Sequence, residues 1–205
     1  MKVLLINGSP RPNGNTALAL GEMARVFEEN GISAEIVQVG NKAVRGCAAC
    51  MQCKQTGKCV FDDIVNETAP KFEEADGIVL GTPVYYASPN GTLLSFADRL
   101  FYSTPFSKAM KVGAVVTAAR RAGNTASFDV LNKYFSISNM PIATSQYWNN
   151  IHGCAPGEAT EDTEGMQTMR TLTLNMTFLM RSIALGKEQF GLPDYEKVTF
   201  TNFIR

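Results

Sequence analysis

The loop at residues 8–16 combines a cation, short polar side chains and glycines. It lies between an apolar, strand-like run and a helical pattern, and it reads Gly8-Ser9-Pro10-Arg11-Pro12-Asn13-Gly14-Asn15-Thr16. The free N–H groups and the positive dipole at the start of a helix favour a phosphate, and Arg11 adds a permanent, forked donor. Ser9, Asn15 and Thr16 contribute hydroxyl and amide groups, while Gly14 lets the backbone approach closely. These residues predict a phosphate site.

Two common nucleotide motifs are missing from this loop. It lacks the Gly-Lys-Ser/Thr ending of a nucleoside-triphosphate P-loop and the Gly-x-Gly-x-x-Gly pattern of dinucleotide sites. The plainer alternative is a polar turn in which Asn15 only caps the following helix.

Four of the five cysteines form a second group with possible chemistry, Cys47-x2-Cys50-x2-Cys53-x5-Cys59. In a reducing compartment, thiols this close together bind a metal or a cluster, or stay free. Zinc also accepts four thiolates, although two successive x2 gaps are less typical of zinc than two separated pairs. The spacing leaves an iron–sulfur cluster, zinc and bare thiols open. Cys154 stands apart, and we expect an ordinary semi-buried thiol.

Alternating apolar runs and helical patterns must position these residues. We predict strands at Val3–Asn7, Ala34–Val39, Gly77–Thr82, Val112–Ala118 and near Pro141–Trp148. We predict helices at Asn15–Glu29, Asp63–Glu74, Gly91–Phe101, Asn124–Phe135 and Gly165–Leu185. This order predicts an α/β fold: a doubly wound, five-stranded parallel sheet with helices on both faces, and a ligand beyond the carboxyl ends of the strands. We expect one domain over 1–205, with a cysteine-rich insertion at 46–60 and a tail at 187–205.

The loop at residues 8–16 resembles the phosphate loop of the NAD(P)H-dependent FMN reductases of the flavodoxin-like superfamily. It departs from flavodoxins proper, whose loop is shorter, with repeated Thr and Gly. The resemblance implies a flavodoxin-like fold that binds FMN phosphate through Ser9, Arg11, Gly14, Asn15 and Thr16.

Two further loops at the same sheet edge extend the resemblance. The Pro-x-Tyr segment after the third strand implies contacts with the flavin ring, which is flat and amphipathic and suits aromatic neighbours, from Pro83, Val84, Tyr85 and Tyr86. We expect one of the two tyrosines to pack into the core. The small-residue loop after the fourth strand implies contacts beside the polar edge of the flavin, from Thr117, Ala118, Ala119, Arg120, Arg121 and Gly123. The two arginines could equally meet the phosphate of a nicotinamide substrate, or lie free in solvent.

The compact cysteine spacing resembles that of the iron–sulfur flavoproteins, which implies a [4Fe-4S] cluster on Cys47, Cys50, Cys53 and Cys59. The Tyr147-Trp148 run and the acidic stretch after it look like the same group of proteins. Farther along, a helical stripe from Met166 to Ile183 predicts core packing or a dimer contact.

Composition limits the partners. The 19 basic and 19 acidic side chains balance, so nothing favours nucleic acid or an anionic membrane. The sequence shows no secretory signal and no stretch of about 18 apolar residues, and a cytoplasmic location is expected. The resemblance also implies a homodimer or homotetramer.

These features predict an FMN-dependent oxidoreductase that takes electrons from NAD(P)H and passes them to a flavin, quinone or similar small acceptor. The chemistry then resides in the flavin, and we expect no catalytic side chain. The alternative is an iron–sulfur flavoprotein electron carrier, in which a ferredoxin-like protein donates electrons to a [4Fe-4S] cluster and FMN accepts them.

Overall fold

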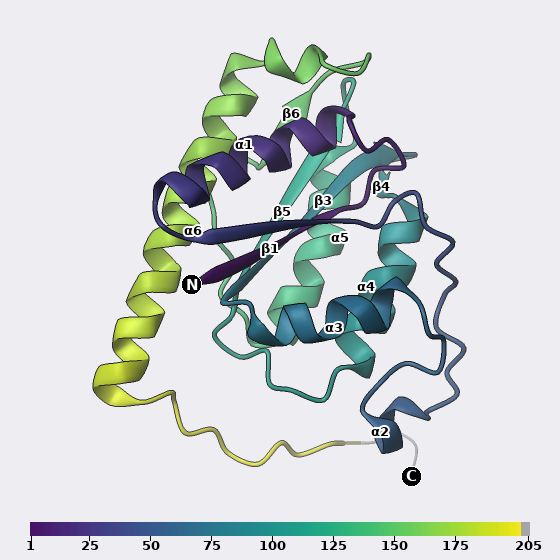
Figure 1. The fold of residues 1–205 in the computed structure, drawn as a ribbon, viewed down its shortest axis with the longest axis vertical. Coiled ribbons are helices and arrows are strands. Elements are labelled where there is room, and N and C mark those ends of the chain that lie inside the picture. Colours follow the sequence, from purple (N-terminus) through teal and green to yellow (C-terminus); the bar gives the residue numbers. More distant parts are fainter. Residues whose placement is uncertain (202–205) are drawn as a thin grey trace.

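A five-stranded parallel sheet forms the centre of the molecule, in a computed structural model that describes residues 1–201 (Figure 1). The strand order is β2-β1-β3-β5-β6, and a short strand, β4, pairs antiparallel with β3. The strands are β1 (Lys2–Asn7), β2 (Ser33–Gln38), β3 (Gly77–Tyr85), β4 (Ser88–Pro89), β5 (Val112–Ala119) and β6 (Asn150–His152). The chain order reverses between β1 and β3, which places the switch point of this doubly wound sheet there. The predicted α/β fold and parallel sheet are confirmed.

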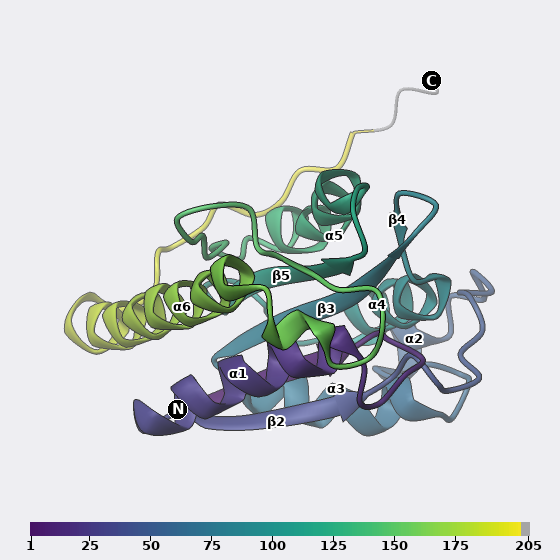
Figure 2. The same ribbon diagram turned by 90° about the horizontal axis from the view of Figure 1, so that it is seen from above.

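Helices cover both faces of the sheet (Figures 1 and 2). They are α1 (Asn15–Glu29), α2 (Cys53–Thr56), α3 (Ile64–Glu74), α4 (Gly91–Ser103), α5 (Asn124–Ile137) and α6 (Thr163–Phe190), with a 3-10 turn at Glu158–Thr160. On one face, α1 and α6 bury a cluster that includes Leu20, Phe27 and Met176. On the other, α3, α4 and α5 bury Phe72, Phe96 and Phe135. The predicted Met-rich stripe of α6 is therefore core, because Met169, Leu172 and Met176 are fully buried.

The fifth strand differs from the prediction of Pro141–Trp148. The chain makes one bridge to β5 at Ile142, leaves the sheet, and returns as β6 at Asn150–His152. The cause is a side-chain turn: the Ser145 hydroxyl hydrogen-bonds to the Tyr147 carbonyl and to the side chain of Asn149. This turn leaves Tyr147 and Trp148 exposed.

The last helix is longer than the apolar stripe indicates. A side-chain cap begins α6, because the Asp162 carboxylate accepts the Gly165 N–H. The Asp63 carboxylate caps α3 in a similar way by accepting the Val65 N–H. From the Asp162 cap, α6 continues to Phe190, so the first four residues of the expected tail at 187–205 are helical. No helix among the described residues is both long enough and apolar enough to cross a membrane.

Glu22 joins α1 to α6. Its carboxylate accepts hydrogen bonds from Arg25 within α1 and from Arg170 of α6. The hydrogen bond from Arg25, the larger effect, and that from Arg170 outweigh burial and lower the pKa of Glu22 from 4.5 to about 2.

Glu22→Gln is therefore expected to lower the free energy of unfolding at pH 7, and to lower it less in acid. A carboxylate with a depressed folded pKa stabilises the fold above its unfolded pKa, and this stabilisation is lost as pH falls through about 2. Urea unfolding of both proteins at pH 7 and pH 3 measures the difference. A gap of the same size at both pH values would contradict the assignment.

Candidate functional site

A hollow of about 170 Å³ opens where the carboxyl ends of β1, β3, β5 and β6 meet. It brings together the predicted loop after β1, the predicted segment after β3 and the loop after β5, which are distant in sequence. Its lining residues are Ser9, Arg11, Gly14, Asn15, Thr16, Pro83, Val84, Tyr85, Ala118, Ala119, Arg120, Gly153 and Cys154. The position agrees with the rule for ligands of open α/β sheets.

Side chains at the ends of β1 and β2 hold the loop after β1 in place by hydrogen bonds. Asn7 accepts the Ser9 N–H and donates its amide to Gln38, which in turn donates to the Ser9 carbonyl at 2.7 Å. The Ser9 hydroxyl accepts the Arg11 N–H at 3.1 Å. Gly40, just after β2, lies so close under the loop that a Cβ atom there would be 2.2 Å from the Gly8 carbonyl oxygen. The loop shape is thus set by β1 and β2 together.

The start of α1 faces this hollow without a side-chain cap. Gly14 is the N-cap residue and no side chain accepts from the first turn. Asn15 does not cap the helix, because its amide donates to the Ala155 carbonyl and its oxygen accepts the Ala159 N–H. The first-turn N–H groups lie beside Ser9 and Arg11, and together they form an anion-binding surface.

The segment after β3 forms a tight hairpin with β4. Tyr86 and Ala87 at its tip have positive φ angles of 51° and 55°, an uncommon conformation for residues with a side chain. The tip packs on the start of α5, where a Cβ on Gly123 would lie 2.9 Å from the Ala87 Cα atom. We expected one tyrosine to be buried, which is wrong: 46% of Tyr85 is exposed, and Tyr86 is fully exposed.

Four of the predicted site residues do not line the hollow. Tyr86 points into solvent, and Arg121 is exposed. Thr117 is buried in β5, where its hydroxyl accepts from Asn124. Gly123 is the N-cap residue of α5, with a φ of 92°, and it lies against Val84 and Ala87 of the hairpin.

The four cysteines of the 46–60 segment line a second, smaller hollow beside α4. Two residues between them, Ala49 and Met51, have positive φ angles of 51° and 61°, which turn the chain between successive thiols. The Ala49 N–H lies 3.4 Å from the Cys47 sulfur. All four thiols are free. Among residues 1–201, no three or more His, Cys, Asp or Glu side chains are arranged for a single metal ion.

Arg99 of α4 lies behind this second hollow, with a side chain that is 1% exposed. Both oxygens of Asp63 accept from it, at 2.7 and 2.9 Å, and its Nε lies 3.2 Å from the Cys59 sulfur. Burial lowers the pKa of Arg99, but the hydrogen bonds to Asp63 and Cys59 outweigh it and raise the pKa overall. The guanidinium is therefore a permanent buried cation next to a thiol.

Comparison with known proteins matches residues 1–153 to the family described as NADPH-dependent FMN reductase. The chain belongs to this family. An iron-sulfur flavoprotein of Methanocaldococcus jannaschii is 37% identical over 183 residues, covering 84% of this chain and 93% of that protein. The flavodoxin-like FMN-binding oxidoreductase predicted from the sequence is confirmed at this level.

Solved structures agree on the fold of this FMN reductase family member. RosB, solved with the bound intermediate 8-demethyl-8-formylriboflavin-5'-phosphate, has a TM-score of 0.72 at 14% identity and covers 100% of this chain and 92% of its own. A flavodoxin from the domain Archaea has a TM-score of 0.58 at 14% identity, covering 88% and 99% of the two chains.

Two lining residues of this family member were missed by the sequence prediction. Gly153 and Cys154 follow β6, and the misplaced fifth strand hid their position at the carboxyl edge. Cys154 is exposed rather than semi-buried. The Glu158 carboxylate accepts the N–H groups of Ala155 and Cys154, and these hydrogen bonds lower the pKa of Glu158. A charged carboxylate thus holds this loop in place.

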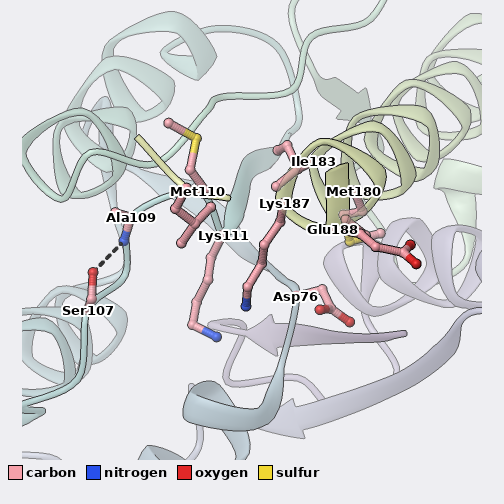
Figure 3. Close-up of a pocket in the computed structure, with 11 residues that line it drawn as sticks. Asp76, Ser107, Ala109, Met110, Lys111, Met180, Ile183, Lys187 and Glu188 are labelled. Atoms are coloured by element: carbon pink, nitrogen blue, oxygen red, sulfur yellow. Dashed lines mark hydrogen bonds between the residues drawn. The ribbon is translucent and has the colours of Figure 1, made fainter. Parts of the chain in front are cut away.

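A hollow of about 530 Å³ lies at the opposite end of the sheet, where Lys111 and Lys187 extend beside Met180 and Ile183 (Figure 3). It is larger than the hollow at the carboxyl edge. The ammonium group of Lys111, one of its two lysines, already donates hydrogen bonds to the Glu73 and Ala75 backbone carbonyls at the end of α3. In this family fold, the amino ends of the strands are not where ligands bind.

Proposed function

We propose that the protein is an NAD(P)H-dependent oxidoreductase that binds FMN in the hollow at the carboxyl ends of the strands. The observation that carries the proposal is the uncapped start of α1 beside Ser9 and Arg11, at the same sheet edge as Tyr85 and Arg120. The first pair suits a phosphate, and the second suits a flat ring with a polar edge. FMN has both a phosphate and such a ring, and it is the flavin named in the description of the matched family.

In this proposal, the residues of the chain bind FMN and orient it. Bound FMN would supply the chemistry of hydride and electron transfer. Ser9, Arg11 and the first turn of α1 would hold the phosphate. Tyr85 would contact the ring, and Arg120 would provide positive charge that favours a reduced, anionic flavin. The electron acceptor is a small molecule such as a flavin or quinone.

Arg11→Ala is expected to weaken FMN binding by roughly 10- to 100-fold and to leave riboflavin binding unchanged. A charged hydrogen bond to phosphate contributes about 1.5–3 kcal/mol, and riboflavin has no phosphate. Fluorescence titration of the flavin-free protein with each ligand measures both constants. Arg121→Ala is the matched control, since Arg121 is exposed outside the hollow. Equal losses for FMN and riboflavin would place the phosphate elsewhere.

The cysteine hollow supports a second proposed cofactor, a [4Fe-4S] cluster on Cys47, Cys50, Cys53 and Cys59. Each thiolate of such a cluster binds a different iron, so the thiols surround a cage wider than one ion. Four thiols line one hollow, which supplies the four thiolates that a [4Fe-4S] cluster takes, and the 37% identical relative is named an iron-sulfur flavoprotein, which favours the cluster over zinc. The backbone N–H of Ala49 also points at the Cys47 sulfur, and such N–H groups stabilise an anionic centre. A ferredoxin-like protein could then deliver electrons, as in the alternative function.

Anaerobic purification of the protein, followed by reduction with NADPH, distinguishes the NAD(P)H-dependent oxidoreductase from the iron–sulfur electron carrier. Absorption near roughly 450 nm would report FMN, and rapid bleaching by NADPH would identify the nicotinamide-dependent activity. About four irons per chain would report the cluster, and fewer than about three would count against it. A colourless protein that fails to bind added FMN would overturn the main proposal.

We also propose a cytoplasmic location and a homodimer or homotetramer. Free thiols remain reduced in the cytoplasm. The outer face of α6 exposes Leu174, Phe178 and Leu185, which a second copy of the chain could cover. Light scattering of the flavin-loaded protein tests the assembly.

A further inference from the structure

The terminal nitrogens of Arg99 donate to oxygen atoms, whereas its Nε donates to a sulfur. Its two terminal nitrogens serve Asp63, and they also reach the Phe61 carbonyl at 3.0 Å and the Arg45 carbonyl at 3.3 Å. Its Nε serves the Cys59 sulfur alone. Asp63 and the two backbone carbonyls accept from the terminal nitrogens, so the hydrogen bond to sulfur is the one made by Nε.

Cys59 is held firmly in front of that donor. The Asn66 side chain accepts the Cys59 N–H and donates to the Cys59 carbonyl, both at 3.0 Å. Asn66 lies in the first turn of α3, three residues after the Asp63 cap, and Arg99 lies in α4. The sulfur and the guanidinium are thus positioned by two helices that pack together on the same face of the sheet. Within residues 1–201, Cys59 is the one cysteine whose sulfur accepts from a charged group.

We propose that Arg99 is a positioning residue that raises the reduction potential of the cluster through its Nε–H···S hydrogen bond to Cys59. The proposal rests on the proposed cluster. One-electron reduction adds a negative charge to the centre, and a hydrogen bond to a ligand sulfur stabilises that charge. Asp63 opposes the effect, because it places a carboxylate against the same guanidinium. The Arg99–Asp63 pair therefore sets the potential by the balance of its two charges.

Three variants of the full-length, anaerobically prepared protein test this balance. Arg99→Gln removes the N–H···S bond and leaves the Asp63 charge, so the midpoint potential of the cluster becomes more negative. Asp63→Asn keeps an acceptor at the α3 cap and leaves the Arg99 charge, so the potential becomes more positive. Arg45→Gln is the matched control: Arg45 is an exposed cation over the Phe61 ring, and its loss leaves the potential nearly unchanged because solvent screens it.

The readout is a redox titration of the cluster followed by electron paramagnetic resonance, with iron content measured on every sample. Shifts of opposite sign in Arg99→Gln and Asp63→Asn support the proposal. Unchanged potentials at full iron content, or shifts of the same sign in both variants, overturn it and leave the cluster itself standing. A wild-type protein without iron overturns the cluster and this proposal together.

Discussion

Asp63→Ala is expected to lower the free energy of unfolding by about 3–5 kcal/mol, the cost of leaving a buried cation without its partner. Arg99 is 1% exposed, and Asp63 accepts from both of its terminal nitrogens. Two backbone carbonyls remain as acceptors, but neither carries a full charge. Loss of the α3 cap adds about 1 kcal/mol. Urea unfolding at matched cofactor content measures the change.

The double variant Asp63→Ala, Arg99→Met separates these two causes. A methionine in place of the arginine removes the unpaired charge and fills much of the same volume, so most of the stability should return. The cap stays lost, so a deficit of about 1 kcal/mol should remain. If the double variant is as unstable as Asp63→Ala, the buried charge is not the source of the loss.

Gly40→Ala is expected to cost about 3 kcal/mol of stability and to weaken FMN binding about tenfold or more. The new methyl group would lie 2.2 Å from the Gly8 carbonyl oxygen and 2.3 Å from the Ser9 carbonyl carbon. Both neighbours are backbone, which cannot rotate aside, so the loop after β1 must move. A displaced loop loses at least one charged hydrogen bond to phosphate.

Gly21→Ala provides the matched control for this prediction. Gly21 lies within α1, and a Cβ there meets nothing within 4 Å. Alanine in a helix interior should raise the free energy of unfolding by roughly 0.5–1 kcal/mol. Thermal unfolding and FMN titration of both variants make the comparison. Wild-type FMN affinity in Gly40→Ala would show that the loop shape is independent of β2.

Local patterns predicted the parts of the fold that local physics controls. The helix at Asn15–Glu29 has the predicted bounds, because its apolar spacing and the following Asn30-Gly31 both act over a few residues. The loops after β1, β3 and β5 were found because the carboxyl ends of parallel strands share one edge. The fifth strand was misplaced because a hydrogen-bonded turn at Ser145 overrides the β propensity of its neighbours.

Contacts between residues that are distant in sequence could not be predicted from sequence patterns. Nothing near Arg99 indicates that it pairs with Asp63, 36 positions away, or that it reaches Cys59. The same holds for Asn15, which has the residue type of a helix cap but serves a loop near residue 155. Polar side chains can satisfy their hydrogen bonds in several ways, and only the packed fold selects among them.

The Asn15 bridge has a consequence for how the protein is made. Its partners, Ala155 and Ala159, are synthesised 140 and 144 residues later, and β6 joins the sheet in the same stretch. A nascent chain on the ribosome can form β1, α1 and β3 early, but the loop after β1 lacks its outer support until residue 159 has emerged. We therefore expect the loop after β1 to reach the shape that binds cofactor only after residue 159 has left the ribosome.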